Sequence, residues 1–179
     1  MEFRFVAPDL RRLDDASAEL LACCVWSDQR PMRGLAGLLD WRLAGRLSML
    51  ARDGFVVGQL GELLFVPGRP RLRFEKVLVL GAGARADFGE DAFRSVVTHL
   101  LRALEGLRVR RAVVELPGRA DGLIDAERAA DLVLECVGDS PLHDAWWLVE
   151  EPDGQRRIAQ RAVDERRRPL VQEQPEQGQ

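Results

Sequence analysis

Residues 28–48 read DQRPMRGLAGLLDWRLAGRLS, and this stretch of the 179-residue chain decides its fold. It combines turn-forming residues, residues that form ion pairs and one large aromatic residue in an order that ordinary packing does not require. The residues that carry the pattern are Asp28, Arg30, Pro31, Gly34, Gly37, Asp40 and Trp41. Such an order is typical of a family signature.

On either side of this stretch, short apolar runs alternate with segments of helical spacing. The runs are bounded by breakers or alternate with polar residues, which predicts strands at residues 3–7, 62–66, 76–80, 111–116 and 145–149. Apolar spacing and capping residues predict helices at residues 16–26, 38–52, 88–104, 125–137 and 154–168. Alternating elements predict an α/β fold of three layers, with a mixed, largely parallel central sheet flanked by helices.

The order of residues 28–42, D-x-R-P-hydrophobic-R-G-x-A-G-hydrophobic-hydrophobic-D-W-R, continues into GRLS at residues 45–48. It resembles the N-terminal domain of the leucine aminopeptidase family, also called the cytosol aminopeptidase family. The resemblance implies a macrodomain-like domain at residues 1–151. From the residues that follow, we expect an arginine-rich helix of the same domain at residues 152–168 and a disordered tail at residues 169–179. In this family the chemistry lies in a separate C-terminal domain that holds two metal ions with Lys, Asp and Glu ligands.

The length of the chain bears on its activity. A chain of 179 residues has no room for both domains, and no stretch of it matches the family's metal-binding segments. We therefore expect a stand-alone, non-catalytic relative of the N-terminal domain, with no catalytic residues, metal or cofactor.

The family context favours structural roles for the signature residues. Asp28 and Asp40 can cap helix starts or pair with the arginines between them. Gly34 and Gly37 permit a tight turn, and Trp41 is expected to fill the core. We favour this scaffold role over a polar site, although Arg and Trp side chains also commonly anchor protein interfaces.

A glycine-rich turn after the expected strand at residues 76–80 is the candidate ligand-binding loop, with Gly81, Gly83, Arg85 and Gly89 as its residues. Residues 81–86, GAGARA, formally match the G-x-G-x-x-G/A dinucleotide fingerprint. In that fingerprint a helix begins at the second glycine, whereas here the loop continues through Gly89. We therefore favour a structural turn.

Binding of ADP-ribose or a related nucleotide is the alternative function, because glycine-rich loops can wrap a diphosphate with backbone amides. The resemblance sets two limits on it. Binding macrodomains use an Asn-bearing loop, and this chain contains no Asn. Neither residues 118–122 nor residues 138–141 resemble the second phosphate loop of those proteins.

Composition bears on the remaining classes of function. A net charge of −3 gives no overall attraction to nucleic acid or membrane, so DNA binding through the arginine-rich helix is only a second alternative. No apolar run approaches the about 18 residues that span a bilayer, so we expect a cytoplasmic protein. Cys23, Cys24 and Cys136 are expected to be reduced thiols, and neither His99 nor His143 has the neighbours of a metal ligand.

The hypothesis that these observations favour is a non-catalytic protein that acts through protein contacts. It would associate with itself or with a separate catalytic partner.

Overall fold

The computed structural model describes residues 2–138 and 144–167. The strands of this part form one six-stranded sheet in the order β1-β6-β5-β2-β4-β3. They are β1 Glu2–Val6, β2 Leu20–Val25, β3 Leu63–Pro67, β4 Lys76–Gly81, β5 Arg111–Val114 and β6 Ala145–Val149. Neighbouring strands are parallel except β3 and β4, which are antiparallel. The predicted mixed, largely parallel sheet is confirmed.

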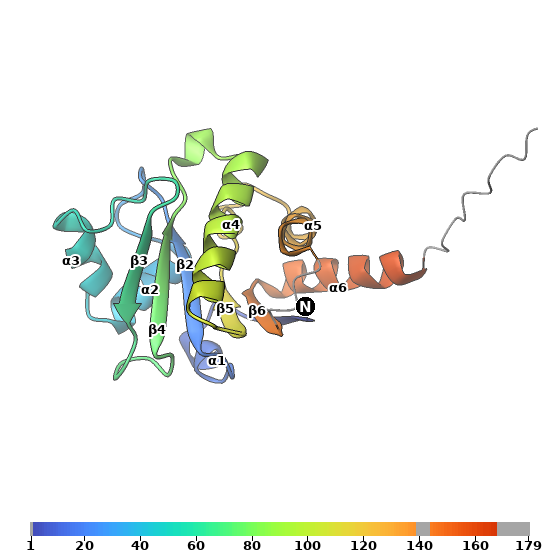
Figure 1. Cartoon of the computed structure of the whole chain (residues 1–179), viewed down its shortest axis with the longest axis horizontal. Coiled ribbons are helices and arrows are strands. Elements are labelled where there is room, and N and C mark those ends of the chain that lie inside the picture. The colour runs from blue at the N-terminus through green and yellow to red at the C-terminus, as the bar shows by residue number, and fades with distance from the viewer. Residues whose placement is uncertain (1, 139–143, 168–179) are drawn as a thin grey trace, which may run out of the picture.

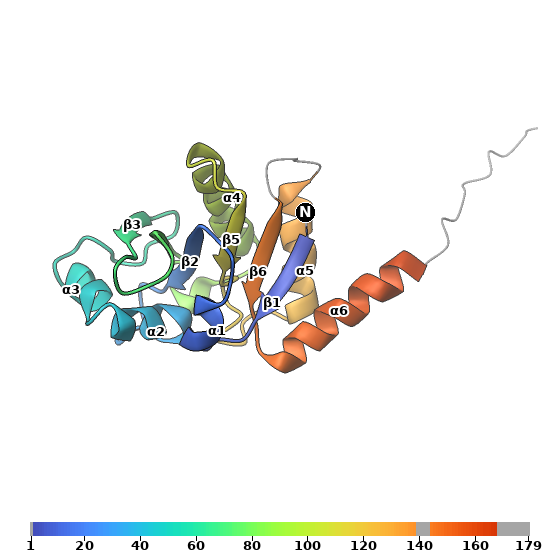
Figure 2. The same cartoon turned by 90° about the horizontal axis from the view of Figure 1, so that it is seen from below.

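Helices cover both faces of the sheet and complete the three layers. They are α1 Leu10–Asp14, α2 Gly34–Arg42, α3 Arg46–Arg52, α4 Glu90–Gly106, α5 Ala126–Val137 and α6 Pro152–Arg167, with a short 3-10 turn η1 at Arg85–Asp87. One face packs against α4 and α5, and the other against α1, α2 and α3 (Figure 1; Figure 2). Because β4 and β2 are buried on both faces, they are apolar without alternation.

The prediction of a helix at residues 16–26 is wrong, because this segment forms β2. All six residues of β2 are buried, and the strand lies between β4 and β5. Leu20 and Ala22 join the core beneath α4 and α5, whereas Leu21 and Cys23 join the opposite core. A short, continuous apolar run fits either a buried strand or a buried helix, so its pattern alone could not decide between them.

The prediction of a single helix at residues 38–52 is also wrong. The chain breaks between α2 and α3 at Ala44 and Gly45, whose φ angles are 57° and 78°. A left-handed backbone cannot continue a right-handed helix, so a second helix begins at Arg46. The predicted core role of Trp41 is wrong as well, because its side chain on α2 is 75% exposed.

The C-terminal helix α6 packs against α5 and then extends away from the body of the domain (Figure 1). Ile158 is buried against Ala126 and Ala130 of α5. The predicted tail at residues 169–179 lies outside the described residues. Within the described ranges, no helix is both long and apolar enough to cross a membrane.

Candidate functional site

The loops that follow the parallel strands all lie at one edge of the sheet, the carboxyl edge, where open α/β sheets usually bind their ligands. Residues 26–33 follow β2, residues 82–89 follow β4, and residues 115–125 follow β5. The start of the signature stretch and the glycine-rich turn therefore meet, although they are far apart in the sequence.

Asp121 joins these three loops. Its Oδ2 accepts a hydrogen bond from Trp26 Nε1 at 2.7 Å, and its Oδ1 accepts one from Gln29 Nε2 at 3.1 Å. The Arg85 guanidinium lies 4.0 Å from the same carboxylate. Trp26 packs edge-on against Phe88, with ring centroids 5.1 Å apart. Side chains thus fill this part of the carboxyl edge.

Asp28 pairs with Arg85 rather than with the arginines of its own stretch. Its Oδ1 accepts hydrogen bonds from the Arg85 backbone at 3.2 Å and from the Arg85 guanidinium at 3.4 Å. The expected pairing with an intervening arginine is therefore wrong for Asp28. Arg85, a candidate ligand-binding residue, is held by the signature stretch.

Arg30 and Asp40 hold backbone groups in place. The Arg30 guanidinium donates to the carbonyl oxygens of Trp26 at 2.6 Å and Val57 at 3.2 Å, and a cis peptide bond links Arg30 to Pro31. Asp40 accepts a hydrogen bond from the backbone N–H of Ser48 at 2.9 Å, in the first turn of α3. Asp40 therefore caps a helix start, as one of its two expected roles required.

Two glycines of the signature stretch are closely packed. Gly34 opens α2 with a φ of 59°, and a Cβ there would lie 2.9 Å from Glu115 Oε1. A Cβ on Gly37 would lie 2.8 Å from the Met32 carbonyl oxygen. Side chains would displace their neighbours at both positions.

Glu115 is the buried acid of the carboxyl edge, and its side chain is only 6% exposed. Its Oε1 accepts a hydrogen bond from the N–H of Leu35 at 2.9 Å, in the first turn of α2, and its Oε2 accepts one from the N–H of Cys24 at 3.2 Å. α2 has no cap from its own N-cap residue and no acid in its first turn. Glu115 therefore supplies a hydrogen-bond acceptor that the N-terminus of α2 lacks within its own residues.

The surroundings of Glu115 also determine its protonation. Burial raises the pKa of Glu115 to about 7, against the two backbone hydrogen bonds that lower it. Burial also raises the pKa of Cys23 and Cys24, since it disfavours the thiolate. Neither thiol has the lowered pKa of an activated nucleophile.

A cavity of about 540 Å³ lies beside Glu115, between the start of α2, the loop after β5 and the start of α6. Arg119 lines it and makes a bidentate ion pair with Glu150, with N–O distances of 2.7 and 2.8 Å. The two side chains are only 15% and 6% exposed. Arg119 is thus already neutralised by a neighbouring acid, and Arg157, which also lines the cavity, pairs with Glu127.

Of the glycines of the predicted ligand-binding loop, Gly81 is closely packed, because a Cβ there would clash with the Gln59 carbonyl oxygen. Gly83 has a φ of 81°, and a Cβ on Gly89 would meet no atom within 4 Å. Gly89 precedes α4, whose first turn contains the acids Glu90 and Asp91. Two carboxylates at that helix start oppose a phosphate there.

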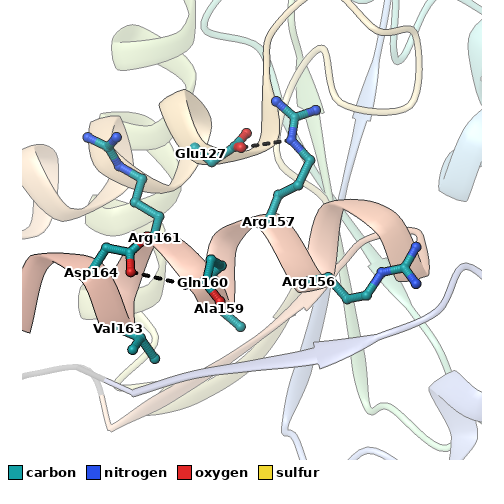
Figure 3. Close-up of a pocket in the computed structure, with 8 residues that line it drawn as sticks. All are labelled: Glu127, Arg156, Arg157, Ala159, Gln160, Arg161, Val163 and Asp164. Atoms are coloured by element: carbon teal, nitrogen blue, oxygen red, sulfur yellow. Dashed lines mark hydrogen bonds and ion pairs between the residues drawn. The ribbon is translucent and has the colours of Figure 1, made fainter.

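A second, open groove of about 800 Å³ runs along α6 (Figure 3). Its arginines face acids: Arg157 contacts Glu127 at 2.7 Å, and Arg161 contacts Asp131 at 2.6 Å. Arg156 contacts Asp153 at 3.1 Å. These three arginines are therefore engaged within the protein.

Of the two histidines, His99 contacts the Ser95 carbonyl oxygen at 2.7 Å, and His143 lies outside the described residues.

Large apolar side chains are exposed along residues 55–65, which we call the apolar edge segment. They are Phe55, Val57, Leu60, Leu63 and Phe65, with exposed fractions between 42% and 65%. The segment runs from the end of α3 into β3, the edge strand of the sheet (Figure 1). Exposed apolar side chains gathered in one segment are typical of an interaction surface.

The signature stretch supports this segment. Besides the hydrogen bond from Arg30 to Val57, the Gly58 carbonyl oxygen accepts one from the N–H of Gly83 at 2.9 Å. A Cβ on Gly58 would lie 2.6 Å from the Trp26 backbone. Glu62 accepts hydrogen bonds from the N–H groups of Val57 and Gly58. The loop is therefore fixed from both ends.

The fold and this edge define the class of the protein, a macrodomain-like α/β domain. The Mycobacterium tuberculosis DarG macrodomain aligns with a TM-score of 0.66 at 17% identity, covering 83% of this chain and 98% of that one. The Trypanosoma brucei macrodomain in complex with ADP-ribose aligns at 0.69 and 15% identity, covering 90% and 69%. A tomato leucine aminopeptidase mutant aligns at 0.63 and 15% identity, covering 89% of this chain and 35% of that one.

Sequence comparison names the family within that class. Residues 24–138 match the model of the cytosol aminopeptidase family, N-terminal domain, and the chain belongs to this family. It is 35% identical over 105 residues to a probable cytosol aminopeptidase of Halorhodospira halophila, covering 58% of this chain and 21% of the relative. The match to the Pseudomonas aeruginosa cytosol aminopeptidase is 29% over 110 residues, covering 62% and 22%. The matched part thus spans about a fifth of these relatives.

Sequence reasoning missed three residues of the carboxyl edge: Glu115, Arg119 and Asp121. One signal was available, because Glu115 is an acid within the otherwise apolar run that ends β5. A charged residue at such a position needs a partner when it is buried. The hydrogen-bond partners of the Asp121 and Glu115 side chains lie 80 or more residues away, so no local pattern identified them.

Proposed function

We propose that this chain is a non-catalytic module of the cytosol aminopeptidase family that acts through protein contacts. The observation that carries the proposal is the apolar edge segment, whose five large side chains are at least 42% exposed. Burying such side chains against a partner removes apolar area from water, which is the main driving force of association. The setting is cytoplasmic, in line with the name of the relatives.

The extent of the family match supports the non-catalytic part of the proposal. The match is confined to the N-terminal domain of the family. Among the described residues, no three His, Cys, Asp or Glu side chains are grouped so that they could hold a metal ion. Metal-dependent release of an amino acid from a peptide by the purified chain would contradict this part.

Nucleotide binding is less favoured, because a side chain of the protein already occupies the start of α2 at the carboxyl edge. The Glu115 carboxylate already accepts the N–H of Leu35 at the start of α2, where a phosphate would otherwise be attracted. The two arginines that line the adjacent cavity are neutralised, Arg119 by Glu150 and Arg157 by Glu127. Thermal unfolding with millimolar ADP-ribose is expected to show no shift in midpoint. A saturable shift that is lost in Gly83→Leu would favour the nucleotide function instead.

A capture experiment tests the interaction function. The tagged chain of 179 residues is incubated with lysate of its source organism, and the captured proteins are quantified by mass spectrometry. We expect a stoichiometric partner, either an aminopeptidase catalytic chain or an untagged copy of the chain itself, and at least tenfold less of it with Phe55→Ser.

Leu134→Ser is the matched control, because Leu134 is also an exposed apolar residue, 45% exposed, but lies on α5. It should capture the partner as the wild type does. Capture by both Phe55→Ser and L63K/F65K that equals capture by the wild type would show that the apolar edge segment is not the contact surface.

A further inference from the structure

Among the described strands, none pairs with the outer side of the edge strand β3. The N–H of Gly81 donates to the Glu62 carbonyl oxygen at 2.8 Å, and the N–H of Gly68 donates to the Glu75 carbonyl oxygen at 2.9 Å. These bonds flank the β3–β4 ladder, so the even-numbered residues of β3 point their N–H and C=O groups toward β4. The same groups of Leu63 and Phe65 therefore point away from the sheet.

These outward groups are available for pairing. Within the part of the chain that the structure describes, no hydrogen bond from outside the strand reaches the backbone of Leu63 or Phe65. Their side chains are 43% and 44% exposed. Natural edge strands are usually protected by charges, prolines, bulges or a covering element. Residues 63–67, LLFVP, contain no charged residue, and the one proline, Pro67, lies at the last position of the strand.

Resting on the proposed function, which requires a protein partner, we propose that the partner of β3 is β3 of a second copy. The two strands pair antiparallel about a two-fold axis at Leu64. Leu63 then lies opposite Phe65 of the second copy, and each of these pairs exchanges both of its N–H···O bonds. The two sheets become one continuous sheet.

Hydrogen-bond geometry selects this register over its neighbours. If the axis moved to Phe65, Leu63 would face Pro67 of the second copy, which has no N–H to donate. If it moved to Leu63, Phe65 would face Gly61, whose φ of 86° is not extended. Only pairing about Leu64 satisfies the outward groups of both Leu63 and Phe65.

The side chains agree with this register. Leu63 and Phe65 face the α4 side of the sheet, and aliphatic and aromatic pairs opposite one another stabilise antiparallel strands. Glu62, the nearest charged residue, would lie opposite Val66 of the second copy and not opposite another acid. No like charges meet along the paired residues. An antiparallel pair of identical strands is also self-complementary, as a two-fold contact requires.

The first test is the mass of the full chain by light scattering and sedimentation across a concentration series. The monomer is 20.1 kDa, and we expect about twice this mass in the micromolar range. L63K/F65K should halve the mass, because it places ammonium groups opposite each other. L63E/F65E should do the same with carboxylates.

Mixing the two double variants shows whether their reduced mass is due to a broken interface or to a misfolded chain. In the mixture, opposite charges face each other across the strands, so the doubled mass should return. A monomer at every concentration for the wild type overturns the pairing. So does a mixture of the two variants that stays monomeric.

A cross-link tests the register itself. In a Cys136→Ser background, L64C places two thiols opposite each other at the axis, at a Cα separation of about 4.5 Å that suits a disulfide. L63C serves as the control, because residue 63 faces residue 65 of the second copy. Rapid oxidation of L64C to a covalent dimer supports the register, and faster cross-linking of L63C overturns it.

These outcomes remain distinct from failure of the proposed function. A wild-type monomer whose capture of a catalytic chain is lost in Phe55→Ser would overturn the self-pairing and leave the interaction function standing. Capture that is insensitive to Phe55→Ser, together with a dimer broken by L63K/F65K, would confine the contact to β3.

Discussion

The carboxyl edge and the apolar edge segment differ in how far their side chains find partners within the protein. At the carboxyl edge, Glu115, Asp121 and Glu150 each find donors within the protein. Along residues 55–65, large apolar side chains face solvent, and no described strand pairs with the outer side of β3. The first region can stand alone, whereas the second is left incomplete. A partner is therefore to be sought at the second region, although ligands of such sheets usually bind at the first.

The two regions are nevertheless mechanically connected. Arg30 spans them, since its guanidinium donates to the carbonyl oxygens of both Trp26 and Val57. The N–H of Gly83 donates to the Gly58 carbonyl oxygen, and the N–H of Ser27 donates to the Gly83 carbonyl oxygen. The polar contacts of the carboxyl edge thus fix the backbone from which the apolar side chains project.

The largest change in the free energy of unfolding is expected when the buried ion pair of Arg119 and Glu150 at the carboxyl edge is broken. Arg119→Met leaves the Glu150 carboxylate buried without its partner, and we expect the free energy of unfolding to fall by about 3–5 kcal/mol. Urea unfolding followed by circular dichroism measures this change. The double variant R119M/E150M should recover much of the loss, because it leaves no buried charge.

Arg156→Met is the matched control for that experiment. Its ion pair with Asp153 is exposed, with both side chains above 70% exposure, so we expect a change within about 0.5 kcal/mol. Similar losses in Arg119→Met and Arg156→Met would mean that the carboxyl edge is not held by its buried charges.

The second prediction concerns the titration of Glu115 and its effect on the stability of the carboxyl edge. Its pKa is raised to about 7 in the folded protein from an ordinary value of 4.5, so the folded state binds more protons between these values. The contribution of Glu115 to stability is therefore fully present below pH 4.5 and is lost as the pH rises through 7. The loss is on the order of 3 kcal/mol.

Glu115→Gln isolates that contribution, because glutamine does not titrate. The difference in unfolding free energy between the wild type and Glu115→Gln should shift against the wild type from pH 5 to pH 8. Urea unfolding at four pH values measures it. A difference that stays constant, or that moves in favour of the wild type with rising pH, would mean that Glu115 is not a desolvated acid.

Much of the fold could be predicted from the sequence, because breakers bound its strands and the helical spacing of α4 and α5 is regular. The order of residues 28–42 identified the family before any contact was known. β2 could not be predicted, since a six-residue apolar run buried on both faces lacks the alternation that distinguishes a strand from a helix. The break between α2 and α3 was missed because apolar residues at helical spacing continue across it; Gly45 was the available signal, whereas the positive φ at Ala44 has none.

The candidate sites were harder to predict than the fold. The contacts that matter join distant residues, such as Trp26 with Asp121, and such pairs are set by strand order rather than by local spacing. The exposure of the apolar edge segment depends on β3 being the last strand of the sheet. Its sequence, bounded by proline and glycine, reads like that of a buried strand.

Replacement of Trp41 gives the smallest expected change in stability. It also tests whether the surface that a partner covers reaches onto α2. A tryptophan in the core would cost about 3–5 kcal/mol on replacement by alanine. At 75% exposure, we expect Trp41→Ala to change the free energy of unfolding by less than about 0.5 kcal/mol, measured by urea unfolding. A loss of several kcal/mol would restore the core role. Because Trp41 lies on α2, outside residues 55–65, Trp41→Ala should also associate like the wild type and show the same mass in light scattering. If its mass fell instead, the surface that a partner covers would reach beyond β3 onto α2, and the signature stretch would contribute a contact as well as a support.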